Sequence, residues 1–421
     1  MQIERKKLLD ALKIANRVVE KKSSMPILAS VQLDGKSATL RGTDLDTGVV
    51  IPLEIARTDE IFTLPAKQLT DIVRSLDVDD VKMTAMEGEG NEGWVNINGM
   101  FEISGYPNDE FPVFEIPETT GYATVGKSAL QNVISAVTKE EAGFSLSGVY
   151  FDAEQEKCVA TDGHRLHMEP ISIDCEKSFM VGAAALKTIM ASTGKDEDEI
   201  TVKTVYRKVV EREGTGEPPD EDILEGLKKA QLIELADDYF NMPFDNKNKV
   251  DDIREFMMDE MQKKSETVHS EEVRSVVAKT ENATFVVRVA ETRFPDYQAI
   301  VPKESKHRIS VKRGDFLAAV KQALTMTNER YKAVKLTFNG KGTIEMNAVN
   351  PDIGSYQRLT VPMTGHVDPA VEAGFNPSFL QSIMEITKDN EAEFEVGINS
   401  DSLPLTFNHG SFEGLVMPMR V

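Results

Sequence analysis

The segment VATDGHRLHM, from Val159 to Met168, places three side chains that could do acid–base chemistry within four positions. Asp162, His164 and Arg165 are of the types that transfer protons or stabilise a developing charge in enzymes. The same segment fits a tight turn between two strands, because Asp and Gly are typical turn residues. No serine or cysteine nucleophile with a suitable partner stands nearby, no glycine-rich phosphate loop occurs, and the six histidines show no ligand spacing. We therefore favour the turn, and expect no catalytic residue, no metal site and no cofactor.

Cysteine content and hydropathy favour a cytoplasmic protein. Only Cys158 and Cys175 occur, without a second pair at metal-ligand spacing, so neither a disulfide framework nor a zinc site is encoded. No run approaches the roughly 18 consecutive apolar residues that a membrane span needs. The first residues also lack the apolar core of a signal peptide. We expect a cytoplasmic location and no membrane partner.

One plan of helices and strands occurs three times along the 421 residues. Each copy opens with an amphipathic helix whose apolar residues follow helical spacing, at Glu4–Glu20, Gly126–Ala142 and Lys312–Glu329. A shorter helix follows in each copy, at Pro65–Leu76, Gly182–Ser192 and Asn376–Thr387. Strand-like stretches lie between the helices, and each copy closes on a strand that begins at Phe101, Phe285 or Phe412. The pattern predicts an α+β fold with two helices packed on antiparallel sheets in each of three similar domains.

The predicted domains are 1–120, 121–304 and 305–421, and the middle one carries an insertion at about 211–272. This segment holds 19 acidic and 8 basic residues, which is half of the net charge of −22. Helix candidates within it are Glu221–Phe240 and Val250–Lys264, and its strand-like flanks suggest that it interrupts a hairpin, where insertions are tolerated. A partner-binding module, a DNA-mimicking arm and a solvated surface ornament all fit its composition.

Basic residues gather on one face of the predicted helices although the chain is acidic. Lys6, Lys13 and Arg17 lie opposite the apolar face of the first helix, at about 100° per residue. The corresponding helices of the three copies carry further cations: Lys67, Arg74, Lys127, Lys139, Lys187, Lys312, Arg313, Lys321 and Lys388. For nucleic acid binding the distribution of charge matters more than its sum. The pattern predicts a surface that contacts phosphates without reading bases.

Several motifs, taken in order, resemble the bacterial DNA polymerase III beta subunit family, the sliding clamps. They are MPIL from Met25, GTDLD from Gly42, ATDGHRL from Ala160, RFPDY from Arg293 and the terminal VMPMRV from Val416. The resemblance covers essentially the whole chain except the insertion. It implies a DNA clamp fold of three domains, and a non-enzymatic processivity factor in which two subunits join head to tail into a ring around duplex DNA. The partners implied are duplex DNA, a replicative DNA polymerase, a clamp loader and a second copy of the chain.

The resemblance also implies a pocket for partner peptides between the second and third domains. Its residues here are Leu146, Thr161, Gly163, His164, Arg165, Leu166, Pro295, Ile300, Asn376, Phe379, Leu403, Leu415, Met417, Pro418 and Met419. Their apolar side chains suit a short linear motif. Two positions depart from the family pattern, since Phe379 stands where Tyr is frequent and Ala299 where Arg is frequent.

By the same resemblance, Lys22 lies in a loop that reaches DNA. Phe101 and Ile103 of one subunit would face Leu324 and Met326 of another and close the ring.

Two other classes of function remain open from the residues. A repeat-built interaction scaffold would use the acidic insertion as its main surface and would not encircle DNA. A hydrolase built on Asp162 and His164 would lose turnover on His164→Ala. The intact ATDGHRL and MPMR motifs favour the clamp over both.

Overall fold

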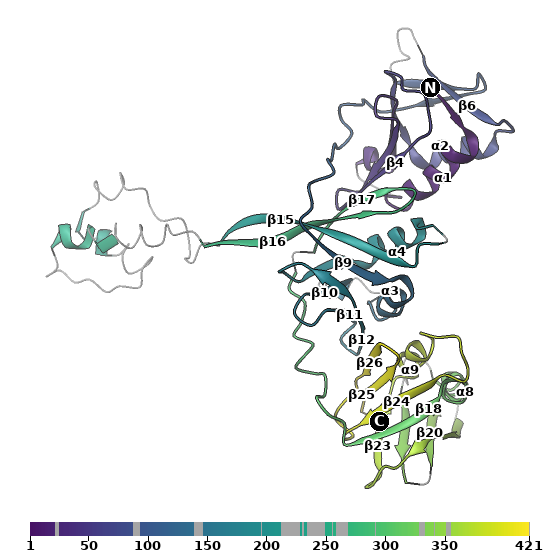
Figure 1. Ribbon diagram of the computed structural model, residues 1–421, viewed down its shortest axis with the longest axis vertical. Helices are drawn as coiled ribbons and strands as arrows, with labels where there is room; N and C mark the ends of the chain where they lie inside the picture. Colours follow the sequence, from purple (N-terminus) through teal and green to yellow (C-terminus); the bar gives the residue numbers. More distant parts are fainter. Residues whose placement is uncertain are drawn as a thin grey trace. The chain divides into compact units, whose positions relative to one another are not determined.

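The computed structural model describes residues 1–21, 25–86, 93–138, 146–194, 196–211, 228–229, 231–233, 249–254, 256–257, 268–290, 292–327, 333–340, 342–350 and 355–420 (Figure 1). Two compact units divide the chain. Unit 1 is Met1–Val205 with Val273–Val421, and unit 2 is Tyr206–Glu272. Within unit 1 we name lobes 1, 2 and 3 by the predicted boundaries 1–120, 121–304 and 305–421, which themselves remain a prediction.

The same order of elements runs through all three lobes. Lobe 1 contains β1 (Gln2–Glu4), α1 (Arg5–Ala15), η1 (Pro26–Ala29), β2 (Ser30–Asp34), β3 (Thr39–Thr43), β4 (Thr47–Pro52), β5 (Ile61–Pro65), α2 (Ala66–Ser75), β6 (Asp80–Ala85), β7 (Trp94–Ile97) and β8 (Phe101–Ser104). Lobe 2 contains β9 (Gly121–Gly126), α3 (Lys127–Ile134), β10 (Gly148–Asp152), β11 (Lys157–Thr161), β12 (Arg165–Pro170), β13 (Ser172–Asp174), β14 (Phe179–Gly182), α4 (Ala183–Ser192), β15 (Glu199–Glu211), β16 (Val268–Lys279) and β17 (Thr284–Arg288). Lobe 3 contains β18 (His307–Lys312), α8 (Arg313–Leu324), β19 (Val334–Phe338), β20 (Thr343–Asn350), β21 (Ser355–Pro362), β22 (Thr364–Gly365), β23 (Val371–Phe375), α9 (Pro377–Met384), β24 (Glu393–Ile398), β25 (Leu405–His409) and β26 (Phe412–Val416). The predicted α+β class with its threefold plan is confirmed.

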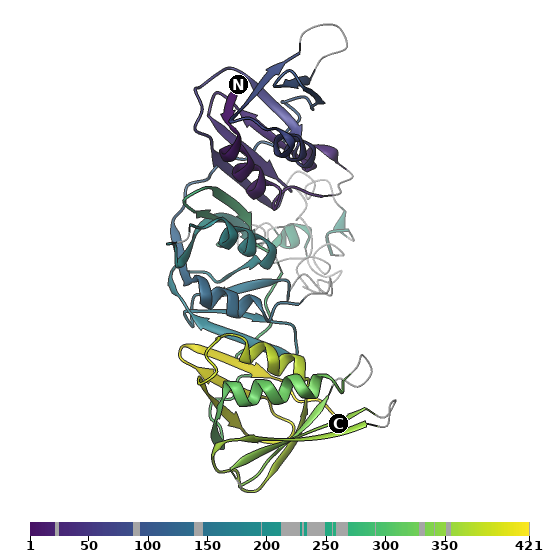
Figure 2. The same cartoon turned by 90° about the vertical axis from the view of Figure 1, so that its right-hand side faces the viewer.

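The first helix of each lobe buries the apolar stripe that its sequence predicts. In α1 the buried positions are Leu8, Ala11, Leu12 and Ala15, which recur at helical spacing. The helix is shorter than predicted: it ends at Ala15, and the side-chain amide of the following Asn16 donates to the Leu12 carbonyl at 2.7 Å and to Thr70 Oγ1 at 2.8 Å. Figure 2 shows the helices of unit 1 in front of the strands. Among the described residues no helix is both long and apolar enough to cross a membrane.

Every lobe is built from two sets of four antiparallel strands. One set is β5-β2-β3-β4 in lobe 1, β14-β10-β11-β12 in lobe 2 and β23-β19-β20-β21 in lobe 3. The other set is β1-β6-β7-β8, β9-β15-β16-β17 and β18-β24-β25-β26. The order of strands is thus the same in each lobe, as the repeat in the sequence requires.

Two seams join the lobes edge to edge, and with β13 added beside β9 and β22 added beside β18 each joined sheet has nine strands. At the first seam β4 pairs with β17, so that Val49 lies opposite Phe285. At the second seam β12 pairs with β26, so that Leu166 lies opposite Leu415. In each case the outer strand of the first set meets the outer strand of the second set of the next lobe.

Unit 2 is described only in part. Helical residues occur at 229 and 231–233, and again at 250–254 and 256–257. Leu232, Ile253 and Met257 are fully buried. Most of the two predicted helices lies outside the described residues, so the fold of the acidic insertion stays a prediction.

Candidate functional site

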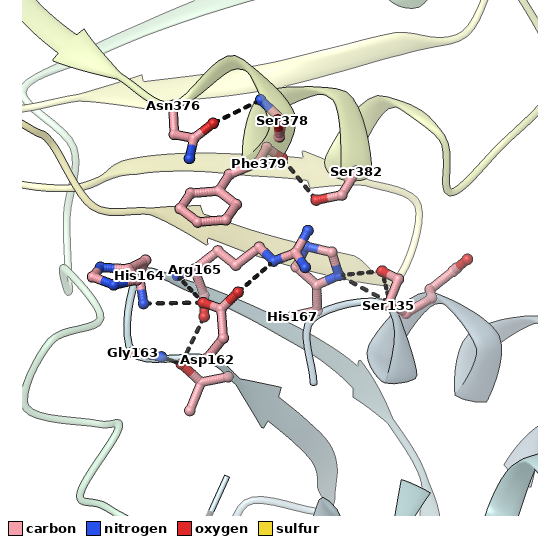
Figure 3. Close-up of polar contacts among 12 residues, drawn as sticks. Ser135, Asp162, Gly163, His164, Arg165, His167, Asn376, Ser378, Phe379 and Ser382 are labelled. Atoms are coloured by element: carbon pink, nitrogen blue, oxygen red, sulfur yellow. Dashed lines mark hydrogen bonds and ion pairs between the residues drawn. The ribbon is translucent and has the colours of Figure 1, made fainter. Parts of the chain in front are cut away.

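The turn between β11 and β12 is closed by its own polar side chains (Figure 3). Thr161 Oγ1 accepts a hydrogen bond from the Gly163 amide at 3.0 Å and donates one to the Arg165 carbonyl at 2.6 Å. Asp162 Oδ1 accepts from the amides of His164 and Arg165 at 3.0 and 3.1 Å. Gly163 has a φ of +84°, which glycine adopts without a Cβ clash. The segment is therefore the predicted tight turn.

Side chains from this turn contact a ring from lobe 3. The Arg165 guanidinium is held by Asp162, since Nε donates to Asp162 Oδ2 at 3.1 Å. The guanidinium carbon lies 5.1 Å from the centroid of the Phe379 ring. The His164 ring stacks on the same ring at 5.9 Å with an interplanar angle of 13°. Asp162 thus positions Arg165 against Phe379, a role that the sequence did not indicate (Figure 3).

Lobe 3 supplies the rest of this wall from the start of α9 and from the chain end. Asn376 caps α9 by accepting a hydrogen bond from the amide two residues on, at 2.9 Å, which fixes the first turn that carries Phe379. The Met417 amide donates to the His164 carbonyl at 2.8 Å, and the Met419 amide donates to a carbonyl of β23 at 2.8 Å. The last residues of the chain are therefore anchored on both lobes.

Beneath the turn an apolar cluster, the seam cluster, spans the β12–β26 seam. Its buried members are Val159, Leu166, Met168, Met180, Phe294, Tyr297 and Leu415, with Met417 half-buried against them. The cluster brings together three predicted pocket residues, Leu166, Leu415 and Met417. The predicted pocket needs an apolar floor of this kind, and the pocket itself stays a prediction.

Other predicted pocket residues lie at the surface. Ile300, Leu403 and Met419 are 40%, 47% and 39% exposed, unusual values for large apolar side chains. Pro295 is exposed, while Pro418 and Leu146 are half-buried. The Ile300 amide donates to the carbonyl of Tyr297 in the seam cluster at 3.2 Å, whereas no described contact joins Leu146 or Leu403 to that cluster. The place of all three residues in the pocket stays a prediction.

Sequence reasoning missed the support of the RFPDY motif. The Tyr297 hydroxyl donates to Asp152 Oδ2 at 2.7 Å across the buried edge of the cluster. Burial and this carboxylate raise the pKa of Tyr297, so the phenol stays protonated. The rings of Tyr150 and Phe294 stack at 4.7 Å with an angle of 1°. Tyr297 appeared in the quoted motif, but nothing in the sequence pointed to Asp152.

A buried polar network crosses the same seam. His167 is completely buried, and its Nδ1 lies 3.0 Å from Ser135 Oγ and 2.9 Å from the Asn132 carbonyl. Its ring meets that of Phe412 edge to face at 5.1 Å. Burial lowers the pKa of His167 to about 4, so the imidazole is neutral at neutral pH. Glu169 joins the network by accepting from Asn132 Nδ2 at 3.0 Å.

These groups do not form a catalytic centre within the described residues. Asp162 is engaged in holding Arg165, and the His164 ring stacks on Phe379. Burial raises the pKa of the Cys158 thiol to about 12, which leaves it protonated and unreactive. No group of three or more His, Cys, Asp or Glu side chains there could hold a metal ion.

The predicted DNA-facing cations lie on or beside the paired helices. Those with exposed side chains are Lys6, Lys13, Arg17, Lys67, Arg74, Lys187, Lys312 and Lys321. Lys127 is half-buried and donates to Thr193 Oγ1 at 2.6 Å. Arg313, expected on the basic face, is 8% exposed and bonds the Met384 carbonyl at 2.8 Å. Lys22 and Lys139 lie outside the described residues.

The residues predicted to close the ring differ in exposure. Phe101 is 37% exposed on β8, whereas Ile103 is 1% exposed and belongs to the core of lobe 1. Leu324 and Met326 are half-buried and pack against the core of lobe 3, as Leu359 of β21 also does. Among the described strands β8 and β21 each end a four-stranded sheet.

Comparisons with known proteins agree with this architecture. The beta sliding clamp of Pseudomonas aeruginosa is 23% identical and the alignment covers 100% of this chain and 99% of the relative. The beta sliding clamp of Bacillus subtilis is 21% identical, with 99% and 98% covered. Among solved structures, a DNA polymerase sliding clamp from Pseudomonas aeruginosa matches with a TM-score of 0.73 at 20% identity, covering 100% of this chain and 99% of that one. A DNA polymerase III beta subunit from Thermotoga maritima matches with a TM-score of 0.72 at 21% identity and the same coverage.

Two family models match the ends of the chain. The N-terminal domain of the DNA polymerase III beta subunit matches residues 1–115, and its C-terminal domain matches residues 298–420. Together the matches cover more than half of the 421 residues. The family is one of non-catalytic processivity factors, which agrees with the expectation of no enzyme. The chain belongs to the DNA polymerase III beta subunit family, the sliding clamps.

Proposed function

We propose that this protein is a DNA sliding clamp that works as a ring of two copies around duplex DNA, in the cytoplasm. The ring would hold a replicative DNA polymerase and a clamp loader through the site at the β12–β26 seam. Topological linkage, rather than tight binding, would keep these partners on DNA. The proposal rests on two edge strands that neither seam pairs with another described strand.

Within the chain each seam joins equivalent strands. Strands β4, β12 and β21 end the first sets of lobes 1, 2 and 3, and strands β8, β17 and β26 end the second sets. Since β4 pairs with β17 and β12 pairs with β26, only β21 of lobe 3 and β8 of lobe 1 have no seam partner among the described strands. A second copy would supply the missing partner for each, because exposed strand edges favour pairing with another chain. A head-to-tail contact forms a closed ring when the rotation between copies closes, and we propose closure at two copies.

The register of the β4–β17 seam is the template for the missing one. Val49 of β4 lies opposite Phe285 of β17, and the next pair is Gly48 with Val286. The ladders within the lobes make Leu359 equivalent to Val49, and Phe101 equivalent to Phe285. Phe101 would therefore lie opposite Leu359 of the second copy.

One residue along, Glu102 of β8 would lie opposite Arg358 of β21 in the second copy. Both side chains are exposed in the single chain, and their charges are opposite. Phe285 is completely buried in its seam, whereas the equivalent Phe101 is 37% exposed. This difference is expected if a second copy covers Phe101.

At the β12–β26 seam the geometry suits a short linear motif with apolar side chains. The seam cluster offers the floor, and Phe379 with the end of the chain offers a wall. The Arg165 charge is already balanced by Asp162, with their side chains 10% and 12% exposed. Ala299 leaves this side of the rim without an arginine. A peptide with Leu or Phe side chains is therefore a better fit than one recognised through carboxylates.

The test is solution mass together with retention on nicked circular DNA and on linear DNA after loading. We expect a dimer of about twice 46.7 kDa that stays on circles and runs off linear ends. Linearising the loaded circles serves as the matched control, because the sequence and the protein are unchanged. A monomer that leaves circles and linear DNA at the same rate would instead support an interaction scaffold, which no described feature favours.

A further inference from the structure

The paired helices of the three lobes can be compared position by position. Their buried residues set the alignment: Leu8, Ala11 and Leu12 of α1 correspond to Leu130, Val133 and Ile134 of α3 and to Phe316, Ala319 and Val320 of α8. In the second helices Leu69 and Val73 of α2 correspond to Leu186 and Met190 of α4 and to Leu380 and Met384 of α9. With the buried faces matched, the charges on the exposed faces can be compared position by position.

One cation has the same structural task in every lobe. Arg5 at the start of α1 bonds the Val73 carbonyl at 3.0 Å, at the end of α2. Arg313 at the start of α8 does the same at the end of α9. Lys127 at the start of α3 donates to Thr193, just after α4. These cations hold the two helices together, and we do not count them as phosphate contacts.

The remaining cations are concentrated in lobe 1. Lys6, Lys13, Arg17, Lys67 and Arg74 are all exposed on α1, the turn after it and α2. Within the described part of the chain no carboxylate pairs with Lys13, Arg17 or Lys67, whereas Arg74 pairs with Asp71 at 3.7 Å and is not counted as a free cation. A groove of about 480 Å³ between the two helices is lined by three cations, Lys13, Lys67 and Arg74, by two carboxylates, Asp10 and Asp71, and by Asn16 and Thr70.

Lobe 3 lacks nearly all of these charges. The positions of Lys6, Arg17 and Lys67 hold Gly314, Thr325 and Ser378, and the position of Arg74 holds Glu385. The cation at the position of Lys13 is kept as Lys321, but its Nζ lies 3.9 Å from Glu385 Oε1. Lys312, at the start of the lobe, is bonded to Glu391 at 2.7 Å. Such exposed pairs add little stability, but each presents almost no net charge to a phosphate.

Lobe 2 is intermediate. Ala184 and Ala191 of α4 stand where α2 has Lys67 and Arg74, and Ser135 stands where α1 has Lys13. Its exposed cation among the described helix residues is Lys187, which lines a groove of about 980 Å³ between α3 and α4. The three lobes therefore form a series from strongly basic to neutral.

We infer that lobe 1 supplies most of the phosphate contacts that hold duplex DNA, and that the helices of lobe 3 contribute almost no attraction to DNA. The inference rests on the proposed function, because it assumes that the helices face the DNA. Phosphate contacts by Lys and Arg dominate binding without sequence preference, so affinity follows the local density of unpaired cations. A ring with this distribution holds DNA at the two copies of lobe 1.

The experiment is equilibrium binding of a fluorescent linear duplex, followed by anisotropy over a series of salt concentrations. In lobe 1, Lys13→Gln is made alone and together with Lys67→Gln. Each lost contact should weaken binding roughly eightfold at 0.1 M salt and lower the salt slope by about 0.9. The matched control is Lys321→Gln, at the same helical position as Lys13, which should change affinity by less than about twofold, since a Lys paired with Glu contributes almost no phosphate contact. The transplant Ser378→Lys with Glu385→Arg, which copies lobe 1 into lobe 3, should tighten binding and steepen the slope.

Two results would overturn the inference. One is a loss on Lys321→Gln as large as the loss on Lys13→Gln, and the other is a lobe 1 double variant that binds like the unchanged protein. Dimer mass and retention on circular DNA are measured on the same samples. If the unchanged protein is not retained on circles, the proposed function fails. If it is retained but the lobes respond equally, only the assignment of DNA contacts to lobe 1 fails.

Discussion

Charge reversal across the proposed contact between two copies gives the sharpest test of the assembly. Glu102→Lys would place a lysine opposite Arg358 of the second copy, and Arg358→Glu would place a glutamate opposite Glu102. Opposite charges facing each other across antiparallel strands contribute roughly 0.2–1 kcal/mol, and like charges destabilise by a similar amount. Losing about 0.5 kcal/mol of attraction and adding about 0.5 kcal/mol of repulsion costs about 1 kcal/mol at each contact.

The ring doubles this effect, because two identical contacts close it. Each single reversal should therefore destabilise the dimer by about 2 kcal/mol and raise its dissociation constant roughly 30-fold. The double variant, Glu102→Lys with Arg358→Glu, restores opposite charges at both contacts and should return close to the affinity of the unchanged protein. Screening by salt should shrink the difference between single and double variants, since the side chains are exposed.

The assay is a dilution series followed by analytical ultracentrifugation. Glu118→Lys is the matched control, because it changes the net charge of the chain equally and lies outside β8. Recovery in the double variant is the decisive observation. If both singles weaken the dimer and the double is weaker still, these residues do not face each other and the proposed register is incorrect.

Three further predictions concern the site and the first seam. Phe379→Ala removes the ring that His164 and Arg165 contact. It should weaken binding of a fluorescent Leu/Phe peptide by about tenfold or more, as loss of a buried aromatic anchor does. Phe379→Tyr should bind within about threefold of the unchanged protein, and equal binding by the unchanged protein and both variants would exclude the ring from the pocket. His167 titrates near 4 when folded and near 6.5 when unfolded, so the free energy of unfolding should fall by up to about 3 kcal/mol as the pH drops through that window. Denaturant titrations should show a flatter profile for His167→Leu, and an unchanged profile would mean that His167 is not the group responsible. Gly48→Ala would place a Cβ 2.6 Å from the Phe114 ring. The overpacking should cost about 1–3 kcal/mol of stability and so lower the thermal midpoint. Gly126→Ala, whose Cβ would have its nearest contact at 3.8 Å, is the control, and equal midpoints would show that the segment with Phe114 yields freely.

Local patterns in the sequence predicted the elements well, and long-range pairing poorly. The apolar spacing of Leu8, Ala11 and Leu12 is enough to predict α1, because that spacing has one amphipathic solution. The end of α1 was missed, because the apolar periodicity continues through Val18 and Val19, which are buried beyond the helix. The seams could not be predicted at all, because nothing in the alternation of β12 specifies β26, which follows some 240 residues later, as its partner.

The site divides in the same way. Asp and Gly in ATDGHRL predicted the turn, which local hydrogen bonds then form. The contact of Arg165 with Phe379 crosses two lobes, and only the family resemblance suggested it. Counting lysines on helices gave Lys321 the same weight as Lys13, because the position of Glu385 beside Lys321 depends on how α8 packs on α9.

The two strand edges that remain at β8 and β21 bear on how such a ring could open. A head-to-tail contact between copies either closes on itself or continues into a filament, and closure at two copies leaves neither β8 nor β21 unpaired. Breaking one contact of the closed form frees one β8 and one β21, while the second contact keeps both copies in a single particle. Opening is then a unimolecular hinge event whose rate is independent of concentration, and reclosure is fast because the freed edges remain tethered. A ring built this way can admit DNA without ever dissociating into its halves.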